Sequence, residues 1–373
     1  VPSFEGGKSM KVCVYAICKN ESKFVRRWME SMSEADGVYV LDTGSEDGTP
    51  ALLTALGAEV TVERISPWRF DTARNRSLAL VPEDADICVC TDLDEFFHPG
   101  WRALLEKAWT EGTNQAAYRY TWNFNPDGSE GHVFWQEKIH SRFGWEWEHP
   151  VHEVPKWTGE GQPKKVYVEG MQLDHRADPG KSRSQYLPLL ELSVAEEPDD
   201  DRNMHYLGRE YYFYGMWEKA IETLKRHVSM PNALWVDERC ASMRYIARSY
   251  LALGDRMHAL MWLYRAIGEA QHLREPYMDI ARFMYSEENW DGVAFFTREA
   301  LRIAVRPRTY ICESESWGSL PYDLLSLALY YTGRGDEAVE AAEKALELSP
   351  EDERIKRNLE LMRKNTVDNA GKV

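Results

Sequence analysis

The first part of the chain alternates short β-favouring runs with segments of helical spacing. Four such runs predict strands, at residues 11–17, 37–41, 59–62 and 86–91. Three segments between them carry apolar residues three and four positions apart and predict helices, at residues 21–32, 49–56 and 71–80. Strands that alternate with helices form βαβ units, so we expect an α/β domain with a mostly parallel, Rossmann-like sheet.

The pattern changes between residues 118 and 168. Residues 118–124 alternate aromatic and polar side chains, and residues 143–153 combine aromatic, acidic and histidine side chains. Strict alternation is typical of a strand with one exposed face. We interpret this region as an antiparallel, loop-rich extension of the α/β domain.

Helical spacing continues from about Tyr186 onwards, and one frame of small residues recurs within it. The clearest copies pair a glycine with an alanine, at Gly215 and Ala220, Gly254 and Ala259, and Gly333 and Ala338. A weaker copy lies at 281–300, and the uneven intervals predict an insertion around 306–321. This frame resembles the tetratricopeptide repeat, a pair of helices whose stacking with its neighbours buries a continuous core.

These patterns divide the chain into four parts. Residues 1–9 precede a methionine and are interpreted as a cloning remnant. Residues 10–185 are predicted to form the α/β domain, residues 186–365 an all-α repeat domain, and residues 366–373 a tail.

Composition narrows the classes of function. The chain has 61 acidic and 45 basic residues, a net charge of −16, which disfavours binding to duplex DNA through its phosphates. No run of apolar residues is long enough to predict a membrane span, and no signal peptide is visible, so we expect a cytoplasmic protein. The six cysteines lack metal-ligand spacing and are expected to be reduced thiols in the core.

Acidic side chains gather where the fourth predicted strand ends. Asp92, Asp94 and Glu95 follow the apolar run directly. Such carboxylates repel one another unless a cation lies among them, and Mg²⁺ or Mn²⁺ bridging a nucleotide diphosphate would be that cation. The alternative is a solvated acidic turn.

Two further motifs border the predicted strands. Asp42 opens the segment 42–49, in which glycines allow close backbone approach; the alternative is a polar turn with Thr49 as helix cap. Asp71, Arg74 and Asn75 lie in the third predicted helix, where Arg74 could neutralise phosphate; the alternative is a surface helix that Asp71 caps.

In order and spacing these motifs resemble family 2 glycosyltransferases of the GT-A fold. Asn20-Glu21, after the first strand, also matches that family. With the helical tail, the chain is most similar to lipopolysaccharide-core glucosyltransferases and bacteriocin peptide glycosyltransferases. The resemblance implies that Asp42 and Glu21 contact the nucleoside of a UDP-sugar. It also implies that Asp94 ligates the metal and that Asp92 contacts ribose or a metal-bound water.

The same resemblance extends to the other residues of the third helix and to Leu93. It implies that Arg74 and Asn75, with Asp71, border the nucleotide. Leu93 departs from the small residue that the family usually has between the two aspartates. This departure leaves the metal ligands intact and puts only the packing of the sugar in doubt.

Later segments supply candidates for the remaining roles. Segment 147–153 matches a pattern of the same enzymes, and Glu153 is the first choice for the general base, His152 the second and Glu148 the third. Glu153 could instead only orient His152. By the same resemblance, His175 is a candidate third metal ligand. Basic side chains that could stabilise the departing diphosphate follow it, at Arg176, Lys181 and Arg183.

The sequence therefore predicts a metal-dependent, inverting glycosyltransferase. It would use Mn²⁺ or Mg²⁺ and a UDP-sugar, with UDP-glucose favoured, and a peptide, protein or saccharide as acceptor. Homo-oligomers could form through the repeats. Three alternatives stay open: a peptide-binding repeat scaffold with a degenerate nucleotide fold, a DNA-base glycosyltransferase, and a nucleotidyltransferase. The last lacks the glycine-rich phosphate loop it would need after the first strand, where Cys18-Lys19-Asn20-Glu21 stand.

Overall fold

The computed structural model describes residues 10–125, 128–178, 180 and 184–370. The segment 1–9 and the basic residues Lys181 and Arg183 lie outside the described residues. The chain divides into two compact units, and the division falls between Ser193 and Val194. The predicted boundary at 185/186 coincides with the start of the helix that contains this division, α5 (Tyr186–Glu196).

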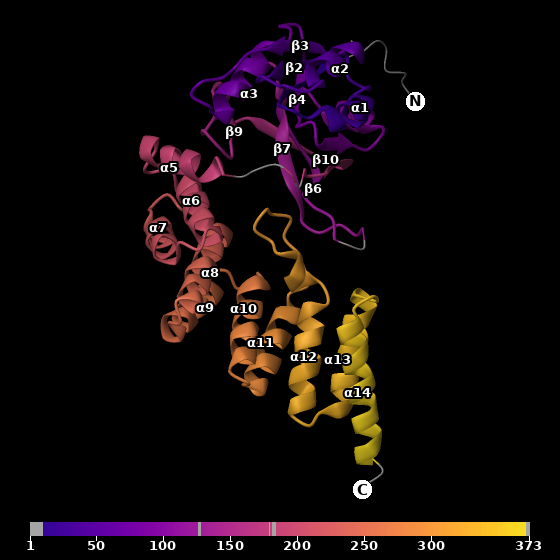
Figure 1. Ribbon diagram of the computed structural model, residues 1–373, viewed down its shortest axis with the longest axis vertical. Helices are drawn as coiled ribbons and strands as arrows, with labels where there is room; N and C mark the ends of the chain where they lie inside the picture. The colour runs from indigo at the N-terminus through magenta and orange to yellow at the C-terminus, as the bar shows by residue number, and fades with distance from the viewer. Residues whose placement is uncertain (1–9, 126–127, 179, 181–183, 371–373) are drawn as a thin grey trace. The chain divides into compact units, whose positions relative to one another are not determined.

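The N-terminal unit begins with four strands that run parallel to one another (Figure 1). They are β1 (Val12–Cys18), β2 (Gly37–Asp42), β3 (Glu59–Val62) and β4 (Ile87–Cys90). The helices between them are α1 (Ser22–Ser31), α2 (Thr49–Ala55) and α3 (Phe70–Ala79). This arrangement confirms the predicted α/β fold.

Later strands complete the same sheet. They are β5 (Glu95–Phe97), β6 (Thr113–Thr121), β7 (Val133–Ser141) and β10 (Lys164–His175), and α4 (Trp101–Ala108) lies between the first two of them in the chain. The order of the eight strands is β3-β2-β1-β4-β7-β6-β10-β5. Among the described strands of this sheet, four neighbouring pairs are parallel and three are antiparallel.

The predicted antiparallel extension is present in part, because β7 is antiparallel to β4 and β6, whereas β10 runs parallel to β6. β7 runs antiparallel to β4, with Cys88 opposite His140, and so joins the later strands to the central sheet. β8 (Trp145–Glu148) and β9 (Val154–Trp157) do form a separate antiparallel pair. Alternation along a strand predicts which face is buried, but it does not identify the strand beside it.

The central strands read as continuous apolar runs because both of their faces are covered. All seven residues of β1 and all four of β4 are buried. Trp28 of α1 and Trp101 of α4 are among the largest fully buried side chains and belong to the same core cluster. This core holds the carboxyl ends of β1, β2 and β4 in place.

Among the described residues of the C-terminal unit, all the regular elements are helices. Four helix pairs are formed by α6 (Asp201–Phe213) with α7 (Trp217–Ser229), α8 (Val236–Ala252) with α9 (Arg256–Glu269), α10 (Glu275–Ser286) with α11 (Trp290–Arg302), and α12 (Leu320–Tyr331) with α13 (Gly335–Leu348). A last helix, α14 (Glu353–Ala370), packs on α13 and runs through most of the predicted tail. The predicted insertion contains the short helix η1 (Ser314–Trp317).

The small residues of the repeat frame allow the paired helices to approach closely. Ala220, Ala259 and Ala338 are fully buried. A Cβ on Gly208 of α6 would lie 2.5 Å from the side chain of Leu224 on α7, so any larger residue would force Leu224 to shift. These positions confirm the tetratricopeptide-like interpretation of the second half.

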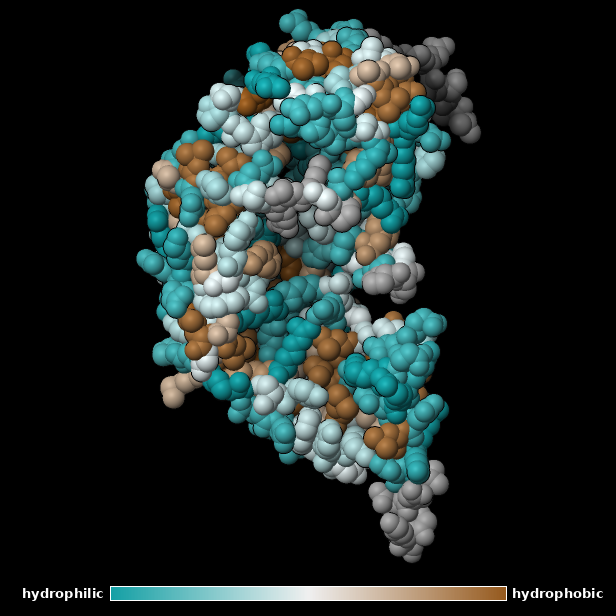
Figure 2. All heavy atoms as spheres, viewed as in Figure 1, coloured by the Kyte–Doolittle hydropathy of each residue, from teal (hydrophilic) through white to brown (hydrophobic). Residues whose placement is uncertain are grey.

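Hydrophilic residues dominate the face of the molecule drawn in Figure 2, and the apolar residues on it form separate groups. Among the described residues, no helix combines the length and the apolar character that crossing a bilayer requires.

Candidate active site

The site is built at one edge of the sheet. β1, β2 and β4 are parallel, and Cys18 at the end of β1 lies beside Asp42 at the end of β2. Ligands of open α/β sheets bind beyond the carboxyl ends of such strands. Glu21, Asp42 and Asp92 are at or just beyond these ends.

Asp42 is fully buried and closes its own turn. Its Oδ1 accepts hydrogen bonds from the backbone N–H groups of Gly44, at 2.9 Å, and Ser45, at 2.7 Å. Gly44 has a φ of +103°, which an L side chain rarely adopts. These bonds are what the turn interpretation of the segment requires, and contact of Asp42 with a nucleoside stays a prediction.

Glu21 joins the loops that follow β1 and β2. It is 3% exposed, and its backbone N–H donates to Thr49 Oγ1 at 2.8 Å. The residue matched by the family motif therefore lies against the turn that Asp42 opens.

Arg74 brings three of the predicted residues into contact. From α3, its Nη2 donates to Asp92 Oδ1 at 2.5 Å and its Nε donates to Glu153 Oε1 at 2.9 Å. The guanidinium is nearly inaccessible, with 3% of the side chain exposed. Burial lowers the pKa of a guanidinium, but the carboxylates of Asp92 and Glu153 outweigh it and raise the pKa of Arg74 well above its ordinary value.

Asn75 and Asp71, the neighbours of Arg74 on α3, make structural contacts. The amide of Asn75 donates to the carbonyl of Trp147 and accepts from the N–H of Trp147, both at 2.8 Å. This pair of bonds fastens β8 to α3. Asp71 forms an ion pair with Arg69 at 2.7 Å and accepts from the N–H of Thr72 at 2.6 Å.

Lys138, on β7, is a site residue that the sequence did not reveal. Its Nζ lies 3.2 Å from Asp92 Oδ2 and 3.4 Å from Glu95 Oε1. Burial lowers its pKa, but these two carboxylates outweigh burial and raise the pKa of Lys138 well above its ordinary value. A lone lysine on an alternating strand gives no signal of this kind until β7 is known to lie beside β4.

Glu95 closes the turn that follows β4. It is 1% exposed and accepts from the N–H of Asp92, at 2.9 Å, and from the Tyr120 hydroxyl, at 2.8 Å. Burial raises its pKa above the ordinary value, and Asp92 adds to that effect. Of the acidic cluster, Glu95 thus has the clearest structural role.

Asp94 and His175 face each other. His175 ends β10 and donates from Nδ1 to the carbonyl of Trp122 at 2.9 Å, so its Nε2 is directed to Asp94 Oδ2, 3.6 Å away. Burial lowers the pKa of His175, but Asp94 and Glu95 outweigh it and raise this pKa above its ordinary value. An imidazole nitrogen and a carboxylate oxygen at this spacing, with Asp92 nearby in the chain, are a donor set that suits Mn²⁺.

The remaining predicted residues lie at the end of β8 and in the loops that follow β8 and β10. Arg176 donates its backbone N–H to the carbonyl of Asp94 at 2.8 Å, and its guanidinium lies 3.4 Å from the centre of the Phe124 ring. His152 has a left-handed φ of 53°, and its ring is 5.7 Å from that of Tyr186. Glu148 forms an ion pair with Lys156 at 2.6 Å. Among the three candidates for the base, Glu153 is the one that shares Arg74 with Asp92.

Comparison with known proteins supports two parts of this description. The family model described as glycosyl transferase family 2 matches residues 13–154. A TPR repeat-containing protein of Synechococcus elongatus is 31% identical over 113 residues, which is 30% of this chain and 26% of that protein. The match thus spans about a quarter of the length of this curated relative.

Two solved structures match this chain with low TM-scores. The Cut9–Hcn1 assembly of the APC/C matches with a TM-score of 0.39 and 14% identity, over 49% of this chain and 33% of that one. MamA matches with a TM-score of 0.37 and 18% identity, over 48% of this chain and 99% of that one. The repeat architecture itself rests on the helix pairs. Residues 13–154 are therefore similar to family 2 glycosyltransferases, and tetratricopeptide-like helical repeats follow them.

Proposed function

We propose that the N-terminal domain transfers a hexose from a UDP-sugar to an acceptor nucleophile, with inversion at the anomeric carbon. The observation that carries the proposal is the contact of Arg74 with both Asp92 and Glu153 at the strand ends of a domain that the family model matches. Through this contact, the acidic motif after β4 and the candidate base come from distant segments to one place.

The donor would bind beyond the ends of β1, β2 and β4. Glu21 and Asp42 would contact the nucleoside, and Arg176 would lie near the diphosphate. Asp94, with Asp92 and His175, would hold Mn²⁺ or Mg²⁺, which supplies positive charge against the departing diphosphate. UDP-glucose is the favoured donor.

Glu153 would act as the general base. The acceptor hydroxyl gives its proton to the carboxylate while the acceptor oxygen bonds to the anomeric carbon, and the bond from that carbon to the diphosphate oxygen breaks. UDP leaves with the electron pair of that bond. Arg74 would orient Glu153 for this step through its Nε contact.

The acceptor would be a peptide, a protein or a saccharide. Tetratricopeptide-like repeats supply extended surfaces for chains of this kind. The net charge of −16 disfavours duplex DNA, and so disfavours the DNA-base glycosyltransferase alternative.

The test is release of UDP from UDP-glucose and other UDP-sugars by the purified protein with Mn²⁺, with and without peptide and saccharide acceptors. EDTA should abolish release, and Mn²⁺ should restore it. Asp94→Asn should lower the rate at least a hundredfold, because the diphosphate loses its counter-charge.

Asp84→Asn is the matched control, since Asp84 is an exposed carboxylate that pairs with Lys11. It should leave the rate unchanged. Full activity in EDTA would exclude metal dependence. If no UDP-sugar is turned over by the wild type, the scaffold alternative replaces the proposal.

A further inference from the structure

A mixed cluster of metal-binding side chains lies inside the C-terminal unit, away from every motif discussed above. Asp201 at the start of α6, His227 on α7 and Glu238 on α8 each bring one ligand atom within 4.8 Å of the others. The three helices belong to the first two helix pairs. The cluster is therefore placed where a ligand would bind one pair to the next.

The geometry of the two buried members indicates a ligand. His227 is fully buried, and among the described residues its Nε2 has no hydrogen-bond partner. Glu238 is 3% exposed, and its Oε2 lies 3.5 Å from that Nε2, which is longer than a normal hydrogen bond. Two ligand atoms of a tetrahedral Zn²⁺ are about 3.4 Å apart, given metal–ligand distances of about 2.0–2.2 Å.

Hydrogen bonds on the far side orient both side chains. Ser242 Oγ lies 2.9 Å from His227 Nδ1 and 2.7 Å from His205 Nδ1. The Tyr310 hydroxyl donates to Glu238 Oε1 and so leaves Oε2 on the side of His227. Metal-ligating histidines and carboxylates usually have such outer partners.

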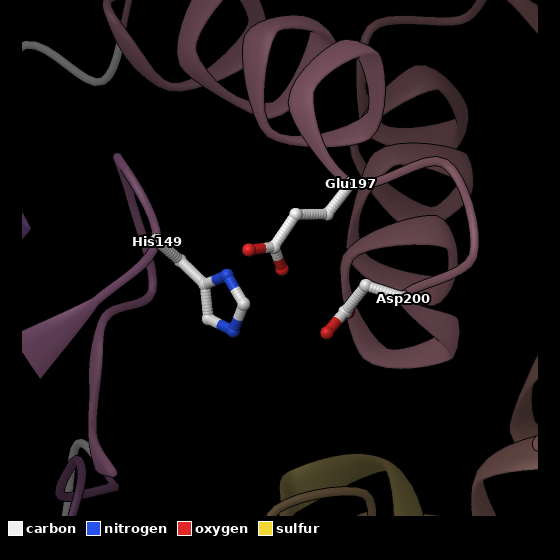
Figure 3. A group of neighbouring side chains, drawn as sticks. All are labelled: His149, Glu197 and Asp200. Carbon is white, nitrogen blue, oxygen red and sulfur yellow. The ribbon is translucent and has the colours of Figure 1, made fainter. Parts of the chain in front are cut away.

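Asp201 connects the cluster to an acidic depression. The depression has a volume of about 410 Å³ and is lined by Glu197, Pro198, Asp199, Asp200, Asp201 and Asn232. Two of its acidic side chains, Glu197 and Asp200, are drawn in Figure 3 at the turn between α5 and α6. Asp201 is half-buried, and it is the cluster residue that reaches this depression, which attracts cations.

We propose that Asp201, His227 and Glu238 form a binding site for one divalent transition-metal ion, of which Zn²⁺ is the model. One imidazole and two carboxylates suit Zn²⁺ better than Mg²⁺ or Ca²⁺, which prefer oxygen alone. Ser242 is a positioning residue that holds the His227 ring. The bound ion would tie α6 and α7 to α8 and stabilise the start of the repeat domain.

The test is the stoichiometry and affinity of Zn²⁺ binding to the full chain, freed of any histidine tag, by competition with a chromophoric chelator. The measurement uses the Asp94→Asn variant, so that the candidate metal site of the N-terminal domain does not contribute to Zn²⁺ binding. A failure of the proposed function can then be distinguished from a failure of the proposed Zn²⁺ site. We expect one equivalent of Zn²⁺ with a dissociation constant below about 1 μM.

Glu238→Gln should weaken this binding at least a hundredfold, and Asp201→Asn at least tenfold. Asp201→Asn is the second variant because Asp201 lies at the start of a helix. Its substitution leaves the hydrogen bond between Tyr310 and Glu238 intact. His258→Ala is the matched control: His258 is an exposed histidine paired with Asp255 in the same unit, and its removal should change nothing.

A second measurement is independent of the variants. Zn²⁺ in excess should raise the midpoint of thermal unfolding of the repeat domain, because a ligand that binds only the folded state stabilises it. The proposal is overturned if the Asp94→Asn protein binds no Zn²⁺ below 100 μM, or if Glu238→Gln, shown to be folded by circular dichroism, binds as tightly as its parent.

Discussion

Arg74 assembles the candidate site at the scale of single residues. Its guanidinium reaches the turn after β4 through Asp92 and the loop before β9 through Glu153. The planar fork of arginine can serve two carboxylates in different directions, which the single ammonium of lysine cannot do in the same way. Arg74 thus links the proposed donor side of the site to the proposed base.

Glu153→Gln tests the base. The variant keeps the size of the side chain and its contact with Arg74 but cannot take a proton. Turnover should fall by roughly two to four orders of magnitude, the span usual for a general base, while the affinity for UDP-sugar barely changes. Steady-state kinetics with UDP-glucose and an accepted acceptor measure both quantities.

His152→Ala is the control for that experiment. It should be milder than Glu153→Gln. The reverse order of severity would assign the base to His152 and leave Glu153 as its orienting group. If both variants are mild, the base lies elsewhere, with Glu148 and Glu95 the next residues to test.

Lys138→Met tests whether the buried ammonium group of Lys138 takes the place of a metal ion between Asp92 and Glu95. Without Lys138, these two carboxylates repel each other, and we expect the free energy of unfolding to fall by about 3 kcal/mol. Mn²⁺ should therefore stabilise the variant more than it stabilises the wild type. Thermal unfolding with and without Mn²⁺ measures the difference, and equal stabilisation of both proteins would contradict this role.

At the scale of elements, a buried hydrogen-bonded chain joins β1, β7 and β8. His140 on β7 donates from Nδ1 to the carbonyl of Ser141, at 2.8 Å, and its Nε2 accepts from the Tyr15 hydroxyl at 2.6 Å. That hydroxyl accepts from Trp147 Nε1 at 2.8 Å. β8 is therefore positioned both by this chain and by Asn75.

The same chain makes the stability of the N-terminal unit depend on pH. Burial lowers the pKa of His140 to about 4, whereas an unfolded histidine has a pKa of about 6.5. Between these values the unfolded chain binds a proton that the folded chain does not. The contribution of neutral His140 to the free energy of unfolding is therefore fully present above pH 6.5. It is lost as the pH falls towards 4, and the total loss is about 3 kcal/mol.

His140→Gln removes this titration but can still accept from Tyr15. Calorimetric unfolding between pH 4.5 and 7 should show a shallower pH dependence of the N-terminal transition in the variant than in the wild type. His98→Gln, at a half-exposed histidine of the same unit, is the control and should keep the wild-type slope. An unchanged slope in His140→Gln would contradict the assignment.

The two units have separate cores at the scale of the whole molecule. Leu105 lies in the core of the first and is fully buried, and Leu263 lies in the core of the second and is 1% exposed. Since each core is contained within its own unit, we expect two unfolding transitions in calorimetry.

Leu105→Ala and Leu263→Ala assign these transitions. Each substitution should cost about 2–5 kcal/mol in its own unit and lower the midpoint of one transition by about 5–15 °C. The other transition should stay in place. A single transition that both substitutions shift equally would show that the units unfold together.

Local pattern was enough to predict the first strands and helices of the N-terminal half and the helix pairs of the second half. The spacing of apolar residues, two apart in strands and three to four apart in helices, predicted β1 to β4 and α1 to α3 close to their observed bounds. The recurring glycine–alanine frame predicted the helix pairs. Alternation and helical amphipathicity depend on neighbours in sequence, so they can be read without knowing the fold. The motif residues at the strand ends could be named for the same reason, because parallel strands end at one edge.

Tertiary structure alone decided which distant segments meet. It put β7, with Lys138, beside β4, joined Arg74 to Glu153 over 79 positions, and gathered Asp201, His227 and Glu238 from three helices. None of these contacts has a local signature, because a charged residue on an alternating strand or on a helix looks the same whether or not it has a buried partner. Each contact exists because the packing of apolar faces brings the backbones together first, and the polar side chains then lie where that packing leaves them.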